Sequence, residues 1–225
     1  MGRISSNAFE GGFFMKQPFV VTINRSCGSG GSTVGRKLAA KLGVNLYNKE
    51  LIDLQNDDVS ADRLKQADER VKSSLYSRLL KDTYDGVLIT KDDPDYEAYE
   101  ELFRQQADAI RRIAEQESCI VIGRCADYVL KDCKNRVSVF ITARGHDCVS
   151  REMERLSLTN KEAKNRREKI NAYRGAYYLH HTGKVWDEPE HYDLVLSTSE
   201  HSYDECAELI LRYLEKNLEK DNEIE

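Results

Sequence analysis

Residues 19–42 read FVVTINRSCGSGGSTVGRKLAAKL: an apolar run, a glycine-rich turn, and then a segment of helical period. Three glycines in four positions lack the Cβ atoms that would keep a backbone away from a ligand, and they permit positive φ angles. A helix opens directly after them, so its positive end faces the same turn. The stretch therefore predicts a strand, a phosphate-binding loop and a helix. The predicted phosphate ligands are Gly28, Ser29, Gly30, Gly31, Ser32 and Thr33.

The turn departs from the full P-loop pattern GxxxxGK[ST] at two positions. Arg25 stands at the first glycine, and Gly31 stands where a lysine would reach the β and γ phosphates. Ser32 keeps the hydroxyl that meets Mg²⁺ in such loops, which makes it the candidate metal ligand. A Gly/Ser turn before a helix is also ordinary connection chemistry, so the rest of the chain must decide.

Composition limits the classes of partner. The chain has 225 residues, enough for one domain with a real core, and its net charge is only −5. This balance argues against nucleic acid or an acidic membrane as the main partner, and it favours small molecules bound at a local anion site. No apolar run approaches the roughly 20 residues that span a bilayer. Nothing in the pattern specifies an oligomeric state.

The six cysteines are spread without CxxC spacing, and no charged-then-apolar signal sequence precedes them. They predict neither disulfides nor a zinc site among themselves, and they favour a cytoplasmic location. Cys27 and Cys125 lie in the two turns that we expect to bind ligand. No histidine close in sequence offers a base, which argues against a nucleophilic cysteine.

Apolar, β-rich runs alternate with segments of helical period. This alternation predicts an α/β fold with a parallel sheet and helices on both faces. The predicted strands are residues 19–23, 119–122, 136–141 and 192–196. The first two lie much farther apart than a crossover requires, which predicts an inserted lobe. The expected parts are a disordered leader (1–17), a core with its lid (18–45 and 118–219), the inserted lobe (46–117) and a tail (220–225).

Three further helices can be delimited from the pattern. One lies in the lobe, where apolar residues from Tyr99 to Ile113 keep helical spacing, after a mobile loop expected at 85–95. Thr159 followed by Glu162 makes a capping box and predicts a helix to about Tyr178. A closing helix carries an apolar stripe between residues 203 and 218 and is expected only to pack.

Arginines are the main candidates for chemistry. Arg124 comes directly after a buried strand, beside a glycine that would let a substrate approach. Arg167 and Arg174 share a helix face, and Arg151 and Arg155 lie four apart on the preceding helix. Guanidinium groups bind phosphate oxygens and spread the charge that develops in phosphoryl transfer. Taken singly, each one is better explained as a solvated or glutamate-paired surface residue, and only together do they favour a ligand role.

Two other features have alternative interpretations. Trp186 follows a glycine and either stacks on a base, hinges a lid, or anchors its loop to the core. His180 and His181 suggest a base or a metal pair, but adjacent helical positions point in different directions, which argues against a shared metal.

Several ordered motifs together resemble the cytidylate kinase-like family, a branch of the P-loop nucleoside monophosphate kinases. The resemblance extends from residue 19 to about 214. It rests on IxRxxGSGG (23–31), LYNKELI (46–52), IVIGRCADYVL (120–130), RGAYYLHHTGKVWD (174–187) and YDLVLSTS (192–199).

This resemblance implies a P-loop NTPase-like, three-layer α/β/α fold. ATP would lie on the glycine loop, the inserted helical lobe would hold the acceptor nucleotide, and the arginine-rich helix would act as a lid. The residue matching Arg124 faces the acceptor phosphate in the related cytidylate kinases, and those matching Arg167 and Arg174 clamp the phosphoryl group. Such an enzyme works by positioning and charge neutralisation.

The chain also departs from that family. Gly31 replaces the lysine, and four expected aspartates are replaced, at Asn48, Ile122, Cys125 and Asn171. We expect Arg25 to bring its guanidinium to the vacant lysine position. We expect Asp53 or Asp127 to take up metal or base recognition, with Lys49 as a further substrate-binding residue.

The leading hypothesis is therefore an ATP- and Mg²⁺-dependent kinase of a nucleoside monophosphate, CMP first. A second hypothesis is a nucleotide-binding protein that has lost catalysis and acts in regulation or assembly, which the missing lysine favours and the retained arginines disfavour. A third is a kinase of another small metabolite.

Overall fold

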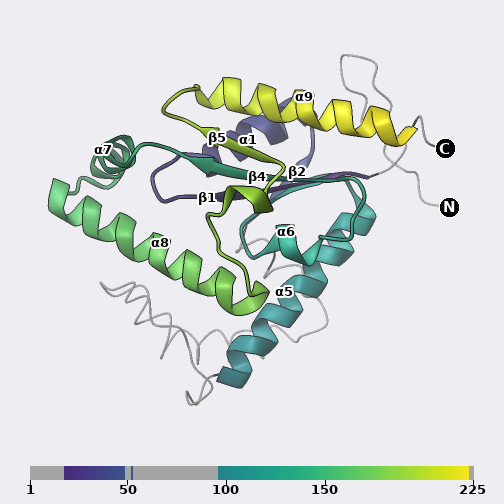
Figure 1. Cartoon of the computed structure of the whole chain (residues 1–225), viewed down its shortest axis with the longest axis horizontal. Coiled ribbons are helices and arrows are strands. Elements are labelled where there is room, and N and C mark those ends of the chain that lie inside the picture. Colours follow the sequence, from purple (N-terminus) through teal and green to yellow (C-terminus); the bar gives the residue numbers. More distant parts are fainter. Residues whose placement is uncertain (1–17, 49–51, 53–95, 223–225) are drawn as a thin grey trace.

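A computed structural model describes residues 18–48, 52 and 96–222 (Figure 1). Several sequence-based expectations lie outside these residues. They are the leader at 1–17, the loop at 85–95, most of the inserted lobe, the end of the tail, Lys49 and Asp53.

Within the described residues, the core is a five-stranded parallel sheet with strand order β2-β3-β1-β4-β5. The strands are β1 (Val20–Arg25), β2 (Asn45–Tyr47), β3 (Cys119–Ile122), β4 (Arg136–Thr142) and β5 (Leu194–Ser197). The four predicted strands are confirmed to within two residues at each end. Strand β2 was missed because it is three residues long and lies at the sheet edge, where none of its side chains is fully buried.

Strand β1 is central because it pairs with β3 on one side and with β4 on the other. Its sequence VVTINR is buried on both faces along almost its whole length, as expected of a strand covered by helices on both sides. Arg25 ends β1 and lies opposite Ile141 of β4. The glycine loop therefore starts at the carboxyl edge of the sheet, where open α/β folds bind ligands.

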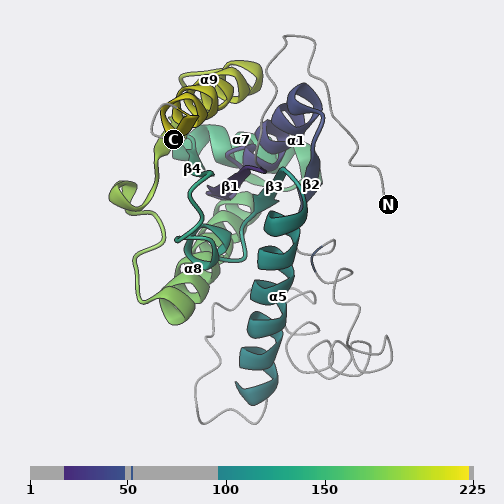
Figure 2. The same ribbon diagram turned by 90° about the vertical axis from the view of Figure 1, so that its right-hand side faces the viewer.

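Helices cover both faces and make the expected three layers (Figures 1 and 2). One apolar cluster joins β1, β3 and β4 to α1 and α9, and others join the opposite face to α5, α6 and α8. The helices are α1 (Gly31–Leu42), α5 (Tyr96–Gln116), α6 (Ala126–Val129), α7 (Gly145–Leu156), α8 (Asn160–Thr182) and α9 (Tyr203–Asn222), with a 3-10 turn η2 (Pro189–His191).

The capping box that begins α8 is present. The Thr159 hydroxyl accepts from the Glu162 amide at 3.3 Å, and the Thr159 amide donates to the Glu162 carboxylate at 2.8 Å. The helix continues to Thr182, four residues beyond the predicted end. It stops there because Gly183 adopts a left-handed conformation, φ 70°, and its amide closes the last turn on Leu179.

Helix α9 runs to Asn222, so it includes the first residues of the expected tail. None of the helices in the described part of the chain combines the length and apolar character needed to cross a bilayer.

Candidate phosphate-binding site

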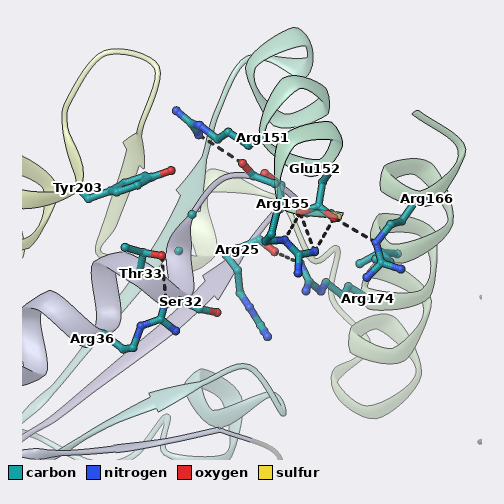
Figure 3. Close-up of a pocket in the computed structure, with 16 residues that line it drawn as sticks. Arg25, Ser32, Thr33, Arg36, Arg151, Glu152, Arg155, Arg166, Arg174 and Tyr203 are labelled. Atoms are coloured by element: carbon teal, nitrogen blue, oxygen red, sulfur yellow. Dashed lines mark hydrogen bonds and ion pairs between the residues drawn. The ribbon is translucent and has the colours of Figure 1, made fainter. Parts of the chain in front are cut away.

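A cavity of about 370 Å³ opens where β1 passes into α1 (Figure 3). Basic side chains from β1, α1, α7 and α8 converge on it. Its lining comprises Arg25, Ser26, Cys27, Gly28, Gly30, Gly31, Ser32, Thr33, Arg36, Arg151, Glu152, Arg155, Arg166, Ile170, Arg174 and Tyr203.

The glycine loop takes a shape that requires its glycines. Gly28 and Gly30 have φ of 78° and 79°, in the left-handed region. A Cβ at Gly28 would meet the Cys148 carbonyl oxygen at 2.5 Å, and one at Gly30 would meet the Tyr203 ring at 2.4 Å. The loop is therefore pressed against α7 on one side and the start of α9 on the other.

The two hydroxyl residues that open α1 both face the cavity, but Ser29 does not line it. Ser29 is fully buried, and its hydroxyl donates to the Ser26 carbonyl at 2.9 Å. Ser29 therefore shapes the turn through its side chain, while Ser32 and Thr33 present hydroxyls at the helix N-terminus.

Arg25 and Gly31 occupy adjoining space. A Cβ at Gly31 would lie 2.5 Å from the Arg25 Cβ, a separation that real structures exclude. From there the Arg25 side chain extends to Gly123, where a Cβ would lie 2.4 Å from the Arg25 Nη1 atom. The space expected to admit a substrate beside Gly123 thus holds the Arg25 guanidinium instead.

Three consecutive residues after β3, Gly123, Arg124 and Cys125, have positive φ of 72°, 58° and 54°. A left-handed conformation costs about 1 kcal/mol or more at a non-glycine residue, and such strain gathers at functional sites. The turn sends Arg124 toward α5, where its Nε and Nη2 donate to Gln106 Oε1 at 2.9 and 2.6 Å. Its guanidinium also lies 4.7 Å from the centre of the Tyr177 ring. Arg124 is therefore held by α5 and α8, outside the cavity lining.

Helix α8 is tied to the loop through polar contacts. Arg174 Nη1 donates to the Arg25 carbonyl at 2.8 Å, and Asn171 Oδ1 accepts from the Cys27 amide at 2.8 Å. Asn171 replaces an expected lid aspartate, yet it retains an oxygen acceptor at this place. Helix α8, the expected lid, is thus docked directly onto the turn between β1 and α1.

Glu152 lies at the centre of an arginine cluster at the cavity wall. Its side chain is 6% exposed, and it accepts from Arg155 Nη2 at 2.8 Å and Arg166 Nε at 3.1 Å. Burial raises the pKa of the Glu152 carboxyl, but hydrogen bonds and charge from the two arginines outweigh it, so the pKa lies below its usual value. One carboxylate thereby positions both Arg155 and Arg166 and offsets one of their two positive charges.

Arg151 braces the loop from α7. Its Nη1 donates to the Thr198 hydroxyl at 2.8 Å and approaches the Gly28 carbonyl at 3.3 Å. Arg167, in contrast, is absent from the cavity lining. Its guanidinium lies about 4 Å from the position of a Cβ on Gly145, at the start of α7.

Asp127 is buried in the core rather than open to a ligand. Its two carboxylate oxygens accept from Asn24 Nδ2 at 2.9 Å and the Tyr178 hydroxyl at 2.5 Å. Burial raises its pKa, partly opposed by these hydrogen bonds. A contact between Asp127 and a base or metal would have to break this network, which links β1 to α8.

The remaining candidates are structural. All six cysteines are free, and burial raises the pKa of Cys27 to about 11, so its thiol is not ionised at neutral pH. Trp186 is buried and packs edge-on against Phe140, with ring centres 5.2 Å apart. The structure thus favours anchoring over base stacking for Trp186.

The structure brings most of the predicted phosphate-binding residues together with Arg25 and Arg174. The sequence interpretation missed Arg36, Arg166, Glu152 and Tyr203 as cavity-lining residues. Arg166 is next to Arg167, so only the rotation of α8 about its axis decides which of them faces the loop. Tyr203 was assigned to packing because it begins the apolar stripe of α9.

Comparisons with known proteins bear on the family and the fold of the chain. A model of the cytidylate kinase-like family matches residues 20–200. A solved, uncharacterised protein from Eubacterium ventriosum is 25% identical, with a TM-score of 0.67 over 88% of this chain and 98% of its own. A sugar kinase from a Janibacter species is 15% identical, with a TM-score of 0.50 over 88% of this chain and 95% of its own. The sequence matches none of the curated proteins.

Proposed function

The chain belongs to the cytidylate kinase-like family, and we propose that it transfers the γ-phosphoryl group of ATP to a nucleoside monophosphate, CMP first. The observation that carries the proposal is the exchange between Arg25 and Gly31. The loop has lost the lysine of the P-loop pattern, but the residue whose stem fills the vacated space is itself a cation. The stem of Arg25 therefore lies beside the phosphate-binding backbone, and it carries the positive charge across to Gly123.

The donor phosphates would lie against the loop amides and the N-terminus of α1. Backbone N–H groups and the helix dipole favour anionic oxygens there without any side-chain charge. Arg25 crosses from the loop to Gly123, next to Arg124. It would therefore stand between the donor and the acceptor, where negative charge increases in the transition state.

Arg124 would bind the acceptor phosphate, and Arg174, already bonded to the Arg25 carbonyl, would meet the transferring group. A phosphate acceptor needs little help from a general base, because its second pKa is about 6 and it is already ionised at neutral pH. Among the described cavity residues Glu152 is the one carboxylate, and it is bound by arginines. The site thus suits positioning and charge neutralisation rather than proton abstraction.

Ser32 would contribute a hydroxyl ligand to Mg²⁺, which in such sites keeps several waters and is otherwise held by phosphate oxygens. The bound ion would neutralise phosphate charge. The described lining offers no unpaired carboxylate to the ion. Phosphate oxygens of the nucleotide would therefore take the places that protein carboxylates fill elsewhere.

A kinase of another small acceptor is the second candidate. Cys125 replaces the aspartate that helps to read cytosine in related cytidylate kinases, and it is only 2% exposed. Asp127, the nearest carboxylate in sequence, is engaged with Asn24 and Tyr178. These two residues weaken the case for recognition of cytosine, but they do not affect the case for the donor site.

The test is ADP release from ATP and Mg²⁺ with a panel of nucleoside monophosphates, followed by a panel of small hydroxylated and phosphorylated metabolites. We expect CMP to raise ADP release well above the rate without acceptor. Activity only with a metabolite would support the second candidate. Tight, calorimetrically measured ATP binding without turnover on either panel would instead identify a nucleotide-binding protein that has lost catalysis.

A further inference from the structure

The C-terminal end of α8 meets the first turns of α5 and brings together three potential metal ligands. Glu100 comes from α5, and His180 and His181 come from the last turn of α8. His180 Nε2 lies 2.6 Å from Glu100 Oε1, and His181 Nδ1 lies 3.9 Å from the same oxygen. One ligand atom from each residue falls within 4.8 Å of the others. Figures 1 and 2 show the end of α8 lying against α5.

The surroundings of His181 are unusual for an imidazole that only fills space. Its side chain is 2% exposed, and its ring stacks on Phe103 with centres 3.8 Å apart and planes 9° apart. Tyr99 stacks at 5.3 Å, and Tyr177 packs edge-on at 4.5 Å. Within the described residues, His181 Nε2 is buried without a hydrogen-bond partner. Nε2 is not the candidate ligand atom, because the nitrogen nearest to Glu100 is Nδ1, and the stacked rings fix the direction in which it points.

We propose that Glu100, His180 and His181 bind a divalent first-row transition metal, with zinc as the first candidate. Two imidazoles and one carboxylate form a set that zinc accepts, and three protein ligands leave a fourth position open. Imidazole ligands suit Zn²⁺, Ni²⁺ and Cu²⁺ and do not suit Mg²⁺. The site is therefore separate in place and in chemistry from the one proposed at Ser32.

Ligand atoms around a tetrahedral zinc ion, at bond lengths near 2.0–2.1 Å, stand roughly 3.3 Å apart. The distance between Glu100 Oε1 and His181 Nδ1 exceeds this value by less than 1 Å. The distance between Glu100 Oε1 and His180 Nε2 falls short of it by less than 1 Å. Rotation of the Glu100 and His180 side chains, which are 30% and 23% exposed, can supply both changes. The buried His181 ring would then be the fixed member of the set.

The hydrogen bond between His180 and Glu100 would be replaced by two metal bonds. Sequence alone argued against a shared metal because the two histidines are adjacent. The third ligand comes from another helix, where no sequence pattern could show it.

A metal at this cluster would also affect how α5 and α8 hold Arg124. Arg124 bonds to Gln106 of α5 and lies over Tyr177 of α8, and Tyr177 packs against His181. A metal at the cluster would link the same two helices, one turn or two farther along. It would therefore fix the distance between the helices that hold Arg124.

The experiment uses the full chain, freed of metal and titrated with Co²⁺ as a spectroscopic probe, followed by displacement with Zn²⁺. We expect one equivalent of Co²⁺ to give visible absorption bands of low-symmetry, four- or five-coordinate cobalt, without the ultraviolet charge-transfer band of a thiolate ligand. Zn²⁺ should abolish the bands and raise the melting temperature.

The variants Glu100→Gln and His180→Gln keep side-chain size at partly exposed positions, so both should fold. Each should weaken Co²⁺ binding by about tenfold or more and remove the rise in melting temperature. His201→Gln is the matched control, because His201 is exposed and does not belong to the cluster. Binding that is absent in the unmodified chain, or equally strong in Glu100→Gln and His180→Gln, would overturn the proposal.

Discussion

The side chain of Arg25 leaves no room for a side chain at Gly31, whose Cβ would lie 2.5 Å from the Arg25 Cβ. In the full P-loop pattern the first position is glycine and the second is lysine. Here the side chain has moved from the second position to the first. An arginine at position 25 makes a glycine necessary at position 31, because the backbone leaves room for a single side-chain stem between these two residues.

The pair can be tested by exchange. Gly31→Lys alone should destabilise the fold by about 1–3 kcal/mol, because it overpacks the space beside Arg25. Arg25→Gly alone should weaken ATP binding by about ten- to a hundredfold, the value of a charge-assisted contact. The double variant recreates GxxxxGKS and should recover binding, although a 3.2 Å approach to Ile141 remains. Calorimetric titration and thermal unfolding measure both effects. A double variant that binds ATP no better than Arg25→Gly would contradict the exchange.

Arg174 and Arg167 should differ in importance. Arg174 lines the cavity and holds the Arg25 carbonyl, whereas the Arg167 guanidinium lies beside Gly145. We expect Arg174→Ala to lower kcat/KM by about a hundredfold, the scale of losing one transition-state donor, and Arg167→Ala to lower it less. Arg212→Ala, at an exposed position of α9, is the control. The assignment fails if the order of the two losses is reversed.

Gln106 should act by positioning Arg124. It is fully buried and accepts from two nitrogen atoms of the guanidinium. Gln106→Leu removes the acceptor and should raise KM for the acceptor substrate by about tenfold, the value of one hydrogen bond to a charged group, while KM for ATP stays unchanged. Gln106→Glu retains an acceptor oxygen and should recover most of the loss. Equal changes in both KM values would indicate general damage to the fold instead.

Glu152 should contribute stability at neutral pH that is lost in acid. Its folded-state pKa lies below the ordinary value of 4.5, so the contribution is complete above pH 4.5 and disappears as pH falls through the folded-state pKa. Glu152→Gln should therefore cost about 1–2 kcal/mol at pH 7, since both arginines remain partly exposed. Denaturant unfolding at pH 7 and pH 3.5 should show this cost shrinking in acid. A cost that is constant across that range would show that the charge is irrelevant.

Asp127 should show the opposite slope. Its folded-state pKa is raised above 3.8, chiefly by burial, so the folded chain binds this proton more tightly than the unfolded chain does. Its contribution to stability therefore declines as pH rises from 3.8 through the folded-state pKa. Asp127→Asn keeps an acceptor for Tyr178 and has no proton to lose. Unfolding measured across this range should show the variant gaining stability relative to the unmodified chain as pH rises, and a relative loss would contradict the assignment.

Much of the fold could be predicted from local patterns. The buried runs of β1, β3 and β4 read as continuous apolar segments because helices cover both of their faces. The start of α8 could be predicted because Thr159 and Glu162 hydrogen-bond to each other within one turn. Strand β2 could not be predicted from the sequence, because a short edge strand has few buried positions to produce a pattern.

The candidate site was predictable only in part. The glycine loop is one continuous segment, so its residues could be named from the sequence. The roles of Arg124, Asp127 and Arg167 depend on contacts with residues 18 to 103 positions away, such as Gln106 and Asn24. Side chains with several rotatable bonds reach partners that their own neighbours in sequence do not reveal.

The sequence by itself determined β1, β3, β4 and β5, the alternation of strands with helices and the presence of a phosphate-binding turn, because hydrophobic periodicity and glycine conformation act over a few neighbouring residues. Only the tertiary structure decided that the stem of Arg25 takes the place of a side chain at Gly31, that Asp127 is committed to Tyr178, and that Glu100 meets His180. Those outcomes depend on which helix packs beside which strand, and that is set by burial summed over the whole core.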